Sequence, residues 1–262
     1  MKMSNGGNEI EGSRNTRFAF PLSLLVGLLL AALPAFSFDF EPISQTFTPT
    51  GAGATRSFEV VNNSAQDIAV QITMVTRQMN EVGQESYAPA SNLFIVFPSQ
   101  IVLRGGAAQA VRVRWIGPAE IKSEQNFRII AAQLPVNFGE TQHTGGSINI
   151  LFRYLGAVYV TPPGARPDVV IAKAEAGTGP EGKRGLYLTF RNKGTAHDVL
   201  SGLHLAITGK SANGTPLTRS FDSAALNGID GANVLAGDSR RFFLPVTGEL
   251  PATDLHVDFS TH

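Results

Sequence analysis

The residues best suited to chemistry in this chain are its histidines and carboxylates, and their spacing matches no catalytic or metal-binding motif. The histidines are His143, His197, His204, His256 and His262. No two of them have the spacing of a metal-binding helix or loop. Two of them, His204 and His256, alternate with apolar residues, which is typical of the exposed face of a strand. The carboxylates come singly, without the pattern of a calcium-binding loop.

Other catalytic signatures are absent from the sequence as well. The chain has no cysteine, so it offers neither thiol chemistry nor a cysteine-based metal site. It contains no nucleophile elbow, no phosphate-binding glycine loop and no dinucleotide fingerprint. An exported carbohydrate-active enzyme on a sandwich scaffold would need paired carboxylates in a cleft, and no motif supplies them. We therefore predict a protein that is not an enzyme and that uses no cofactor and no metal.

The length and composition predict packed domains with many turns. At 262 residues the chain has room for one large or two ordinary domains. Hydrophobic residues make up 43% of the sequence, which is enough to build cores. The 27 glycines and 15 prolines indicate frequent turns between short elements.

The N-terminus has the layout of a secretory signal peptide. Basic residues, among them Arg14 and Arg17, precede an apolar stretch at 18–36. The small residues Ala35 and Ser37 have the spacing of a signal peptidase site. The alternative is a membrane anchor, because the apolar stretch is nearly long enough to span a bilayer.

Cleavage is favoured over an anchor by Pro34, by the small-residue site and by the strand-like sequence that follows. We therefore predict that residues 1–37 are removed and that the mature chain begins near Phe38. Removal takes away three of the 21 basic and two of the 21 acidic residues, which leaves a net charge near −1. This charge predicts neither a nucleic-acid partner nor an anionic membrane partner. Without cysteines, the exported domains must be held by packed cores alone.

The first half of the mature chain is a series of short strands separated by turn residues. The expected strands lie at 38–47, 56–63, 67–78, 93–98, 109–117, 127–138 and 147–160. Seven strands over about 120 residues are typical of an immunoglobulin-like sandwich. The pattern then breaks at TPPGARP, residues 161–167, because three prolines and a glycine cannot continue a central strand.

A second series of strands follows this break. The expected strands lie at 169–176, 185–192, 201–210, 217–223, 240–246 and 254–260. We therefore predict an all-β protein of two immunoglobulin-like sandwiches in tandem. The predicted bounds are 38–160 for the first domain, 161–167 for the linker and 168–262 for the second domain.

The last strand of the first domain raises the question of what covers it. In SINILFRYLGAVYV, residues 147–160, the apolar Ile148, Ile150 and Phe152 share one face. They could face the core of their own domain, with Leu151, Arg153 and Leu155 facing outward, or they could enter another protein. Alternation by itself leaves both alternatives open.

The order of these features resembles the periplasmic pilus-assembly chaperones of the chaperone/usher pathway, which have a signal peptide, two sandwiches and a proline-containing linker. In FIVFPSQIVLRGGAAQAVRVRW, 94–115, a proline, a leucine and a glycine turn lead into a V-R-V strand. EQNFRIIAAQLP, 124–135, begins with an acidic residue and ends on a proline. LYLTFRNKGTAHDVL, 186–200, is similar to a turn-containing stretch of the second domain.

The resemblance implies a periplasmic chaperone of boomerang-like architecture that binds, folds and caps pilus subunits and delivers them to an outer-membrane usher. Subunits of that pathway are sandwiches that lack a strand, and the chaperone lends one by donor-strand complementation. By position, the lending residues here would be Ile148, Ile150, Phe152 and Tyr154. Fully burying one such Ile or Phe is worth about 1.5 to 3 kcal/mol. The resemblance also implies pilus subunits and the usher as partners, with self-capping dimers as a further state.

The sequence departs from the family at the residues that grip the subunit's C-terminal carboxylate. Classical members use an arginine in the first strand and a lysine late in the lending strand, where this chain has Ser44 or a neighbour of it, and Leu155. These departures place it near the archaic or alternative branches. The first-domain cations that could replace the missing pair are Arg56, Arg112, Arg114, Arg128 and Arg153. Of these we prefer Arg128 and Arg153, on the strands expected to lie side by side.

One alternative belongs to a different functional class. The chain could itself be a secreted β-sandwich pilus subunit or an adhesin-type surface protein. Subunits usually carry one incomplete domain with an N-terminal extension, whereas this sequence predicts two complete domains. We therefore favour the chaperone.

Overall fold

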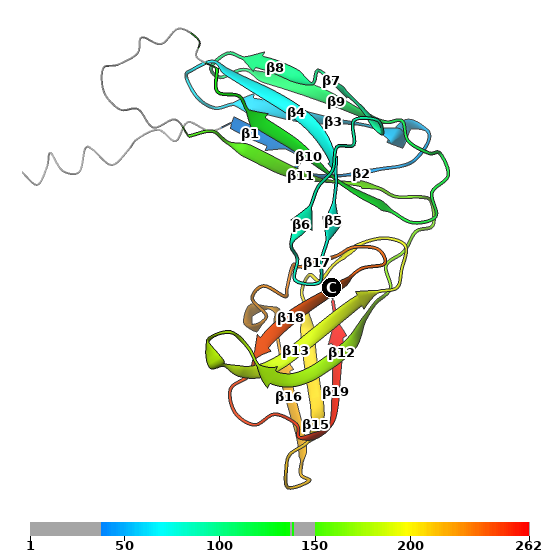
Figure 1. Ribbon diagram of the computed structural model, residues 1–262, viewed down its shortest axis with the longest axis vertical. Coiled ribbons are helices and arrows are strands. Elements are labelled where there is room, and N and C mark those ends of the chain that lie inside the picture. Colours follow the sequence, from blue (N-terminus) through cyan, green and yellow to red (C-terminus); the bar gives the residue numbers. More distant parts are fainter. Residues whose placement is uncertain (1–37, 137, 139–149, 262) are drawn as a thin grey trace, which may run out of the picture. The chain divides into compact units, whose positions relative to one another are not determined.

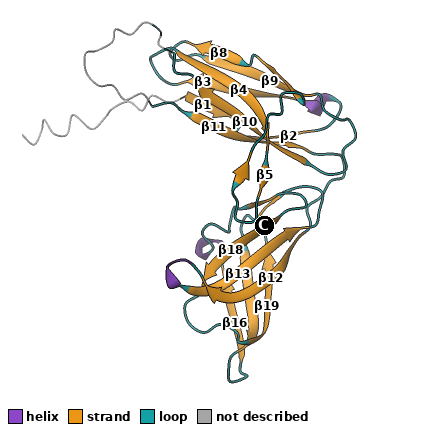
Figure 2. Cartoon of the chain, viewed as in Figure 1, coloured by secondary structure: helices purple, strands orange, loops and turns teal. Residues whose placement is uncertain are grey.

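The computed structural model describes residues 38–136, 138 and 150–261, which are built mainly of strands (Figures 1 and 2). The helical elements of these residues are the single turns η1 (Ala52–Ala54), η2 (Pro180–Gly182) and η3 (Ser223–Ala225). Within the described ranges no helix has the length and apolar character needed to cross a membrane. The predicted all-β class is confirmed. The predicted signal peptide, 1–37, lies outside the described residues.

Two sheets face each other in the first sandwich. One has the order β1-β3-β9-β7, with β1 (Phe38–Glu41), β3 (Thr55–Asn62), β9 (Ala108–Trp115) and β7 (Phe94–Phe97). The other has the order β2-β11-β10-β4-β8, with β2 (Ser44–Phe47), β11 (Arg153–Val160), β10 (Gln125–Gln133), β4 (Ile68–Thr76) and β8 (Gln100–Leu103). A separate small hairpin pairs β5 (Gln78–Met79) with β6 (Glu85–Ser86).

Alternating side chains from both sheets build the first core. In β9, for example, Val111, Val113 and Trp115 are buried while the arginines between them are exposed. At the centre of this core, the ring of Phe94 meets those of Trp115 at 5.1 Å and Phe127 at 4.9 Å, both edge to face. The core therefore joins the two sheets without a disulfide.

The predicted first strand, 38–47, is divided between the two sheets. Its first part, β1, pairs antiparallel with β3, and its second part, β2, pairs parallel with β11. Pro42 lies between the two parts and, lacking an N–H, cannot donate a ladder hydrogen bond. The crossing brings β2 beside the last strand of the first sandwich.

The second sandwich has its own core and follows after residues 161–168. Its larger sheets have the orders β12-β13-β18 and β16-β15-β19, and β14 pairs with β17. The strands are β12 (Val169–Thr178), β13 (Arg184–Asn192), β14 (Asp198–Val199), β15 (His204–Lys210), β16 (Pro216–Phe221), β17 (Asn233–Val234), β18 (Ser239–Pro245) and β19 (Thr253–Ser260). Buried leucines such as Leu186, Leu188 and Leu205 form the centre of the core. The exact domain and linker bounds stay predictions.

Candidate functional site

Strand β11 changes character along its length. Its C-terminal part, Ala157–Val160, is paired on one side with β10 and on the other with β2. Its N-terminal part, Arg153–Leu155, pairs with β10, and β2 does not extend alongside it. A strand edge that the chain's own sheet does not continue is a site where another chain can add a strand.

The predicted lending residues differ in their surroundings. Ile148 lies outside the described residues, and Ile150 is 69% exposed. Phe152 and Tyr154 are half-buried and pack against the core of their own sandwich. The Tyr154 ring also meets the ring of Phe38 edge to face at 4.8 Å. Among the described residues of this apolar row, Ile150 is therefore exposed and the following two pack in the chain's own core.

The two predicted carboxylate anchors are not brought together. Arg128 on β10 pairs in register with Ala157, whereas the exposed Arg153 pairs with Ala132 at the other end of the ladder. Four residues of strand separate these two positions, about 13 Å. The other predicted cations lie elsewhere: Arg112 and Arg114 are exposed on the opposite sheet. Ser44 on β2 and Arg128 on β10 both pair with Ala157, so Arg128 lies on the other side of β11 from Ser44.

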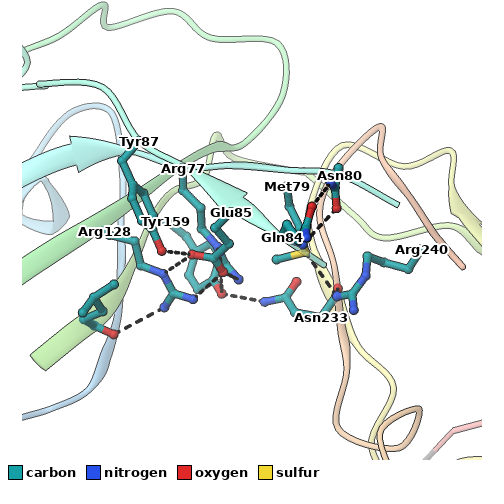
Figure 3. Close-up of polar contacts among 11 residues, drawn as sticks. Arg77, Met79, Asn80, Gln84, Glu85, Tyr87, Arg128, Tyr159, Asn233 and Arg240 are labelled. Atoms are coloured by element: carbon teal, nitrogen blue, oxygen red, sulfur yellow. Dashed lines mark hydrogen bonds and ion pairs between the residues drawn. The ribbon is translucent and has the colours of Figure 1, made fainter. Parts of the chain in front are cut away.

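Arg128 takes part in a cluster with Arg77 and Glu85, and this cluster is drawn in Figure 3. Its Nε donates to Glu85 Oε2 at 2.9 Å and its Nη2 to Oε1 at 2.7 Å, a two-pronged contact. Arg77 also binds Oε1, from Nε at 2.9 Å and from Nη2 at 2.7 Å. The Tyr87 hydroxyl donates to Oε2 at 2.8 Å. We call Arg77, Arg128 and Glu85 the arginine clamp.

The clamp carries excess positive charge in a shielded place. The side chain of Arg77 is 4% exposed and that of Glu85 is 14% exposed. Burial by itself would raise the pKa of Glu85, but hydrogen bonds from Arg128 and Tyr87, with the charges of both arginines, lower it to about 2. Burial disfavours the charged form of Arg128, yet its hydrogen bond with Glu85 leaves its pKa raised. Two cations therefore share one ionised carboxylate.

Tyr159 connects the clamp to the second sandwich. Its hydroxyl accepts a hydrogen bond from Arg77 Nη1 at 3.2 Å and another from Asn233 Nδ2 at 2.7 Å (Figure 3). Its ring belongs to a small apolar cluster with Ala157, Leu235 and Met79. Tyr159 and Ala157 thus lie on the face of β11 opposite the first core, next to residues of the second sandwich.

Comparison with known proteins shows what the first sandwich is similar to. Residues 47–165 match the model for the N-terminal domain of the pili and flagellar-assembly chaperones, represented by PapD. This match covers the last strand of the first sandwich and the residues of the clamp. The first sandwich therefore matches the N-terminal domain of the pilus-assembly chaperones.

Solved structures of chaperones share the fold over both sandwiches. One is the CsuC–CsuE complex of chaperone and tip adhesion subunit from the archaic Csu pili of Acinetobacter baumannii, with 14% identity, 84% of this chain and 97% of that chain covered, and a TM-score of 0.55. Another is the Salmonella enterica SafA pilin with the SafB chaperone, with 16% identity, 88% and 99% covered, and a TM-score of 0.53. The class 5 fimbriae chaperone CfaA has 13% identity, 86% and 100% covered, and a TM-score of 0.51. A search of curated protein sequences gives no match.

The chain has a second polar junction, centred on Glu124, the acidic residue that begins the segment 124–135. Its side chain is 1% exposed. It accepts hydrogen bonds from the Thr161 hydroxyl at 2.8 Å, from the His197 backbone N–H at 3.1 Å and from His197 Nδ1 at 2.7 Å. His197 also stacks on Tyr159, with the ring centroids 3.7 Å apart. The histidine therefore joins the sandwiches.

Sequence reasoning missed Arg77, Glu85 and the hairpin that carries Glu85. Each hairpin strand has only two residues, too short for an alternating pattern to show. The signal that was available is the turn between them, where the Asn80 side chain accepts hydrogen bonds from the backbone N–H groups of Val82 and Gln84. Gly83, with φ of 85°, adopts the left-handed conformation that this turn needs.

The hairpin also contacts β18 of the second sandwich. The Arg241 N–H donates to the Glu81 carbonyl at 2.7 Å, and Arg240 Nη1 lies 3.1 Å from Met79 Sδ (Figure 3). Met79 pairs in register with Glu85 across the hairpin. The clamp carboxylate and the contact with β18 are therefore held by the two strands of one small element.

In the described part of the chaperone, no group of three or more histidine, aspartate or glutamate side chains is arranged to hold a metal ion.

Proposed function

We propose that this chaperone works in the periplasm, where it lends the segment 148–154 to pilus subunits and delivers them to an outer-membrane usher. The observation that carries the proposal is the exposed Ile150, which lies just before Arg153–Leu155, where β2 does not extend along the edge of β11. A partner strand can hydrogen-bond to such an edge while apolar side chains of the lent segment enter its groove. The chaperone–subunit complexes among the similar structures support this function.

The apolar side chains supply much of the binding energy. Ile148, Ile150 and Phe152 would be inserted, with Tyr154 continuing the row toward the chaperone's own core. Burying each fully contributes about 1.5 to 3 kcal/mol, from which the cost of ordering both partners is subtracted. Ile150 offers the most of the described residues, because it is exposed in the unbound chain.

Arg128 would anchor the subunit's terminal carboxylate. It lies beside Ala157, on the strand that neighbours the lending strand, and it belongs to a clamp with one positive charge in excess. A carboxylate that leaves water needs such a cation, and a guanidinium offers two parallel donors. Arg153, exposed and outside this cluster, would have an accessory role at the open end of β11.

Co-expression with a subunit gene from the same operon tests the strand-lending proposal. Ile150→Asp should abolish co-purification of the subunit, because a buried charge in the groove is strongly unfavourable. Since Ile150 is exposed in the free chain, the variant should keep the wild-type thermal stability. Val102→Asp is the matched control, because Val102 is 63% exposed on β8, at the opposite edge of the same sheet. If Ile150→Asp retains the subunit as well as the control does, the segment is not lent.

Fractionation tests the proposed compartment. The full chain should appear in the periplasmic fraction, and the mass of its mature form should correspond to an N-terminus near Phe38. Retention of residues 1–37 on a membrane-bound form would contradict cleavage and favour the anchor.

A further inference from the structure

We propose that Glu85 is a built-in competitor for the carboxylate anchor: it occupies Arg128 in the unbound chaperone and gives it up when a subunit carboxylate arrives. This inference rests on the proposed function and concerns how the same site is controlled. In this proposal, the hairpin holds Glu85 against Arg128 for as long as no subunit is bound.

The clamp has the chemistry of a carboxylate site that is already filled. Both oxygens of Glu85 accept hydrogen bonds from Arg128, and Oε1 also accepts from Arg77. Tyr87 adds a neutral donor to Oε2. A carboxylate with donors on both oxygens is bound as a terminal carboxylate of another chain would be.

The charges allow an exchange of partners. Arg77 is the more deeply buried of the two cations and binds Glu85 through two of its own nitrogens, so it can hold Glu85 after Arg128 has turned away. Arg128 can then take the incoming carboxylate. Two arginines with two carboxylates are neutral, whereas the unbound clamp has one uncompensated positive charge. The uncompensated positive charge of the unbound clamp therefore favours binding of a second carboxylate.

The position of the clamp fits the end of a bound strand. Arg128 pairs with Ala157 on β11, and the lent segment lies upstream in the sequence, with its last residues, Arg153 and Tyr154, at the start of that strand. A subunit strand laid along the chain from Ile150 would meet β2, which occupies the edge of β11 from Ala157 onward. Its end would therefore stop beside Ala157, within reach of the Arg128 guanidinium.

The hairpin of β5 and β6, which carries Glu85, has few backbone pairs to break when Glu85 moves. It lies on a strand of only two residues, paired with one other strand of two residues. Losing Arg128 as a partner would remove one of its anchors at that strand. Because Met79 on the paired strand contacts Leu235 and Arg240 of the second sandwich, the exchange would loosen this contact.

Acetate is a probe for the exchange that needs no subunit. In Glu85→Gln the two arginines lose their carboxylate, so 100 mM sodium acetate should raise the melting temperature by about 3 °C over sodium chloride at equal ionic strength. The wild type should show a difference below about 1 °C. Glu81→Gln is the matched control, because Glu81 is the other hairpin glutamate and contacts Arg241 through its backbone carbonyl. An equal acetate response in all three proteins would overturn the proposal.

A second measurement uses the wild-type residues at the clamp. The chain has no cysteine, so Val82→Cys, at an exposed position of the hairpin turn, accepts a single spin label. The label should become more mobile when the chaperone binds a subunit, and unchanged mobility would contradict displacement of Glu85. Because the acetate response needs no lent strand, it should persist in Glu85→Gln combined with Ile150→Asp. A failure of strand lending and a failure of the exchange are thereby distinguished.

Discussion

Glu85 and Glu124 are two shielded glutamates near the junction of the sandwiches, and their partners differ in kind. Glu85 is bound by two arginines within the first sandwich. Glu124 is bound by a hydroxyl, a backbone N–H and an imidazole, two of which belong to the turn at His197 in the second sandwich. The first arrangement has charge to spare and can exchange a partner, while the second satisfies one carboxylate with fixed donors. The comparison indicates a responsive contact beside a fixed one.

Among the tests of this comparison, Arg77→Met should have the largest effect on the free energy of unfolding. The substitution keeps the length of the side chain but removes a nearly buried cation, which leaves Glu85 with one arginine and Tyr159 without one of its donors. Glu85 keeps Arg128 as its partner, so the cost is that of the lost hydrogen bonds from a charged donor, which are worth about 1.5 to 3 kcal/mol each. We expect a loss of about 2 to 3 kcal/mol in the free energy of unfolding, measured by urea denaturation.

The control for Arg77→Met is Arg112→Met. Arg112 is exposed on the outer face of β9, so its loss should change the free energy of unfolding by less than about 0.5 kcal/mol. Equal effects of the two substitutions would show that the clamp contributes nothing beyond a surface arginine.

The second largest effect is expected from acid, which should weaken the stabilisation that ionised Glu85 provides. The pKa of Glu85 is lowered from 4.5 to about 2 in the folded chain. Since the unfolded state binds its proton first as pH falls, this stabilisation is complete above pH 4.5 and is lost between 4.5 and about 2. Allowing for solvent screening, the loss amounts to about 1 to 2 kcal/mol.

Urea denaturation at pH 6, 4 and 3 measures this loss, with Glu85→Gln as the reference that lacks the titrating group. The wild type should lose more stability than the variant as the pH falls through this range. Parallel curves for the two proteins would mean that Glu85 does not keep a low pKa in solution.

The sequence predicted the elements better than it predicted the site, for a physical reason. In strands such as β9, apolar and polar residues alternate because one face of the strand is buried. This alternation can be recognised from neighbouring residues alone. The clamp joins Arg128 to Glu85, which lies 43 residues away in the sequence. Arg128 could be selected by residue type and strand position, but nothing local indicates that a glutamate from a two-residue strand binds it.

The lending segment shows a second limit of sequence patterns. The alternation predicted one face for Ile150, Phe152 and Tyr154, but not where along the row burial begins. The structure has Phe152 and Tyr154 packed against the first core and Ile150 exposed. Packing in the chain's own core therefore holds for Phe152 and Tyr154, and entry of Ile150 into another protein stays a prediction. The boundary depends on where β2 and the first core end, which is a property of the folded chain.

The smallest effect is expected at the fixed junction, from His197→Gln. The glutamine side chain can replace the imidazole N–H as a donor to Glu124, and the backbone N–H of residue 197 still donates. What is lost is the stacking of the imidazole on Tyr159 at 3.7 Å, which for aromatic pairs is worth about 1 kcal/mol. We expect a loss of that size in thermal denaturation and an unchanged acetate response of Glu85→Gln. His256→Gln, at an exposed position on β19, is the control and should have no measurable effect.

A larger loss in His197→Gln, together with a changed acetate response, would mean that the two glutamates are coupled through Tyr159, which contacts both His197 and Arg77. In that case the junction at Glu124 would be part of the responsive contact and not a fixed hinge beside it.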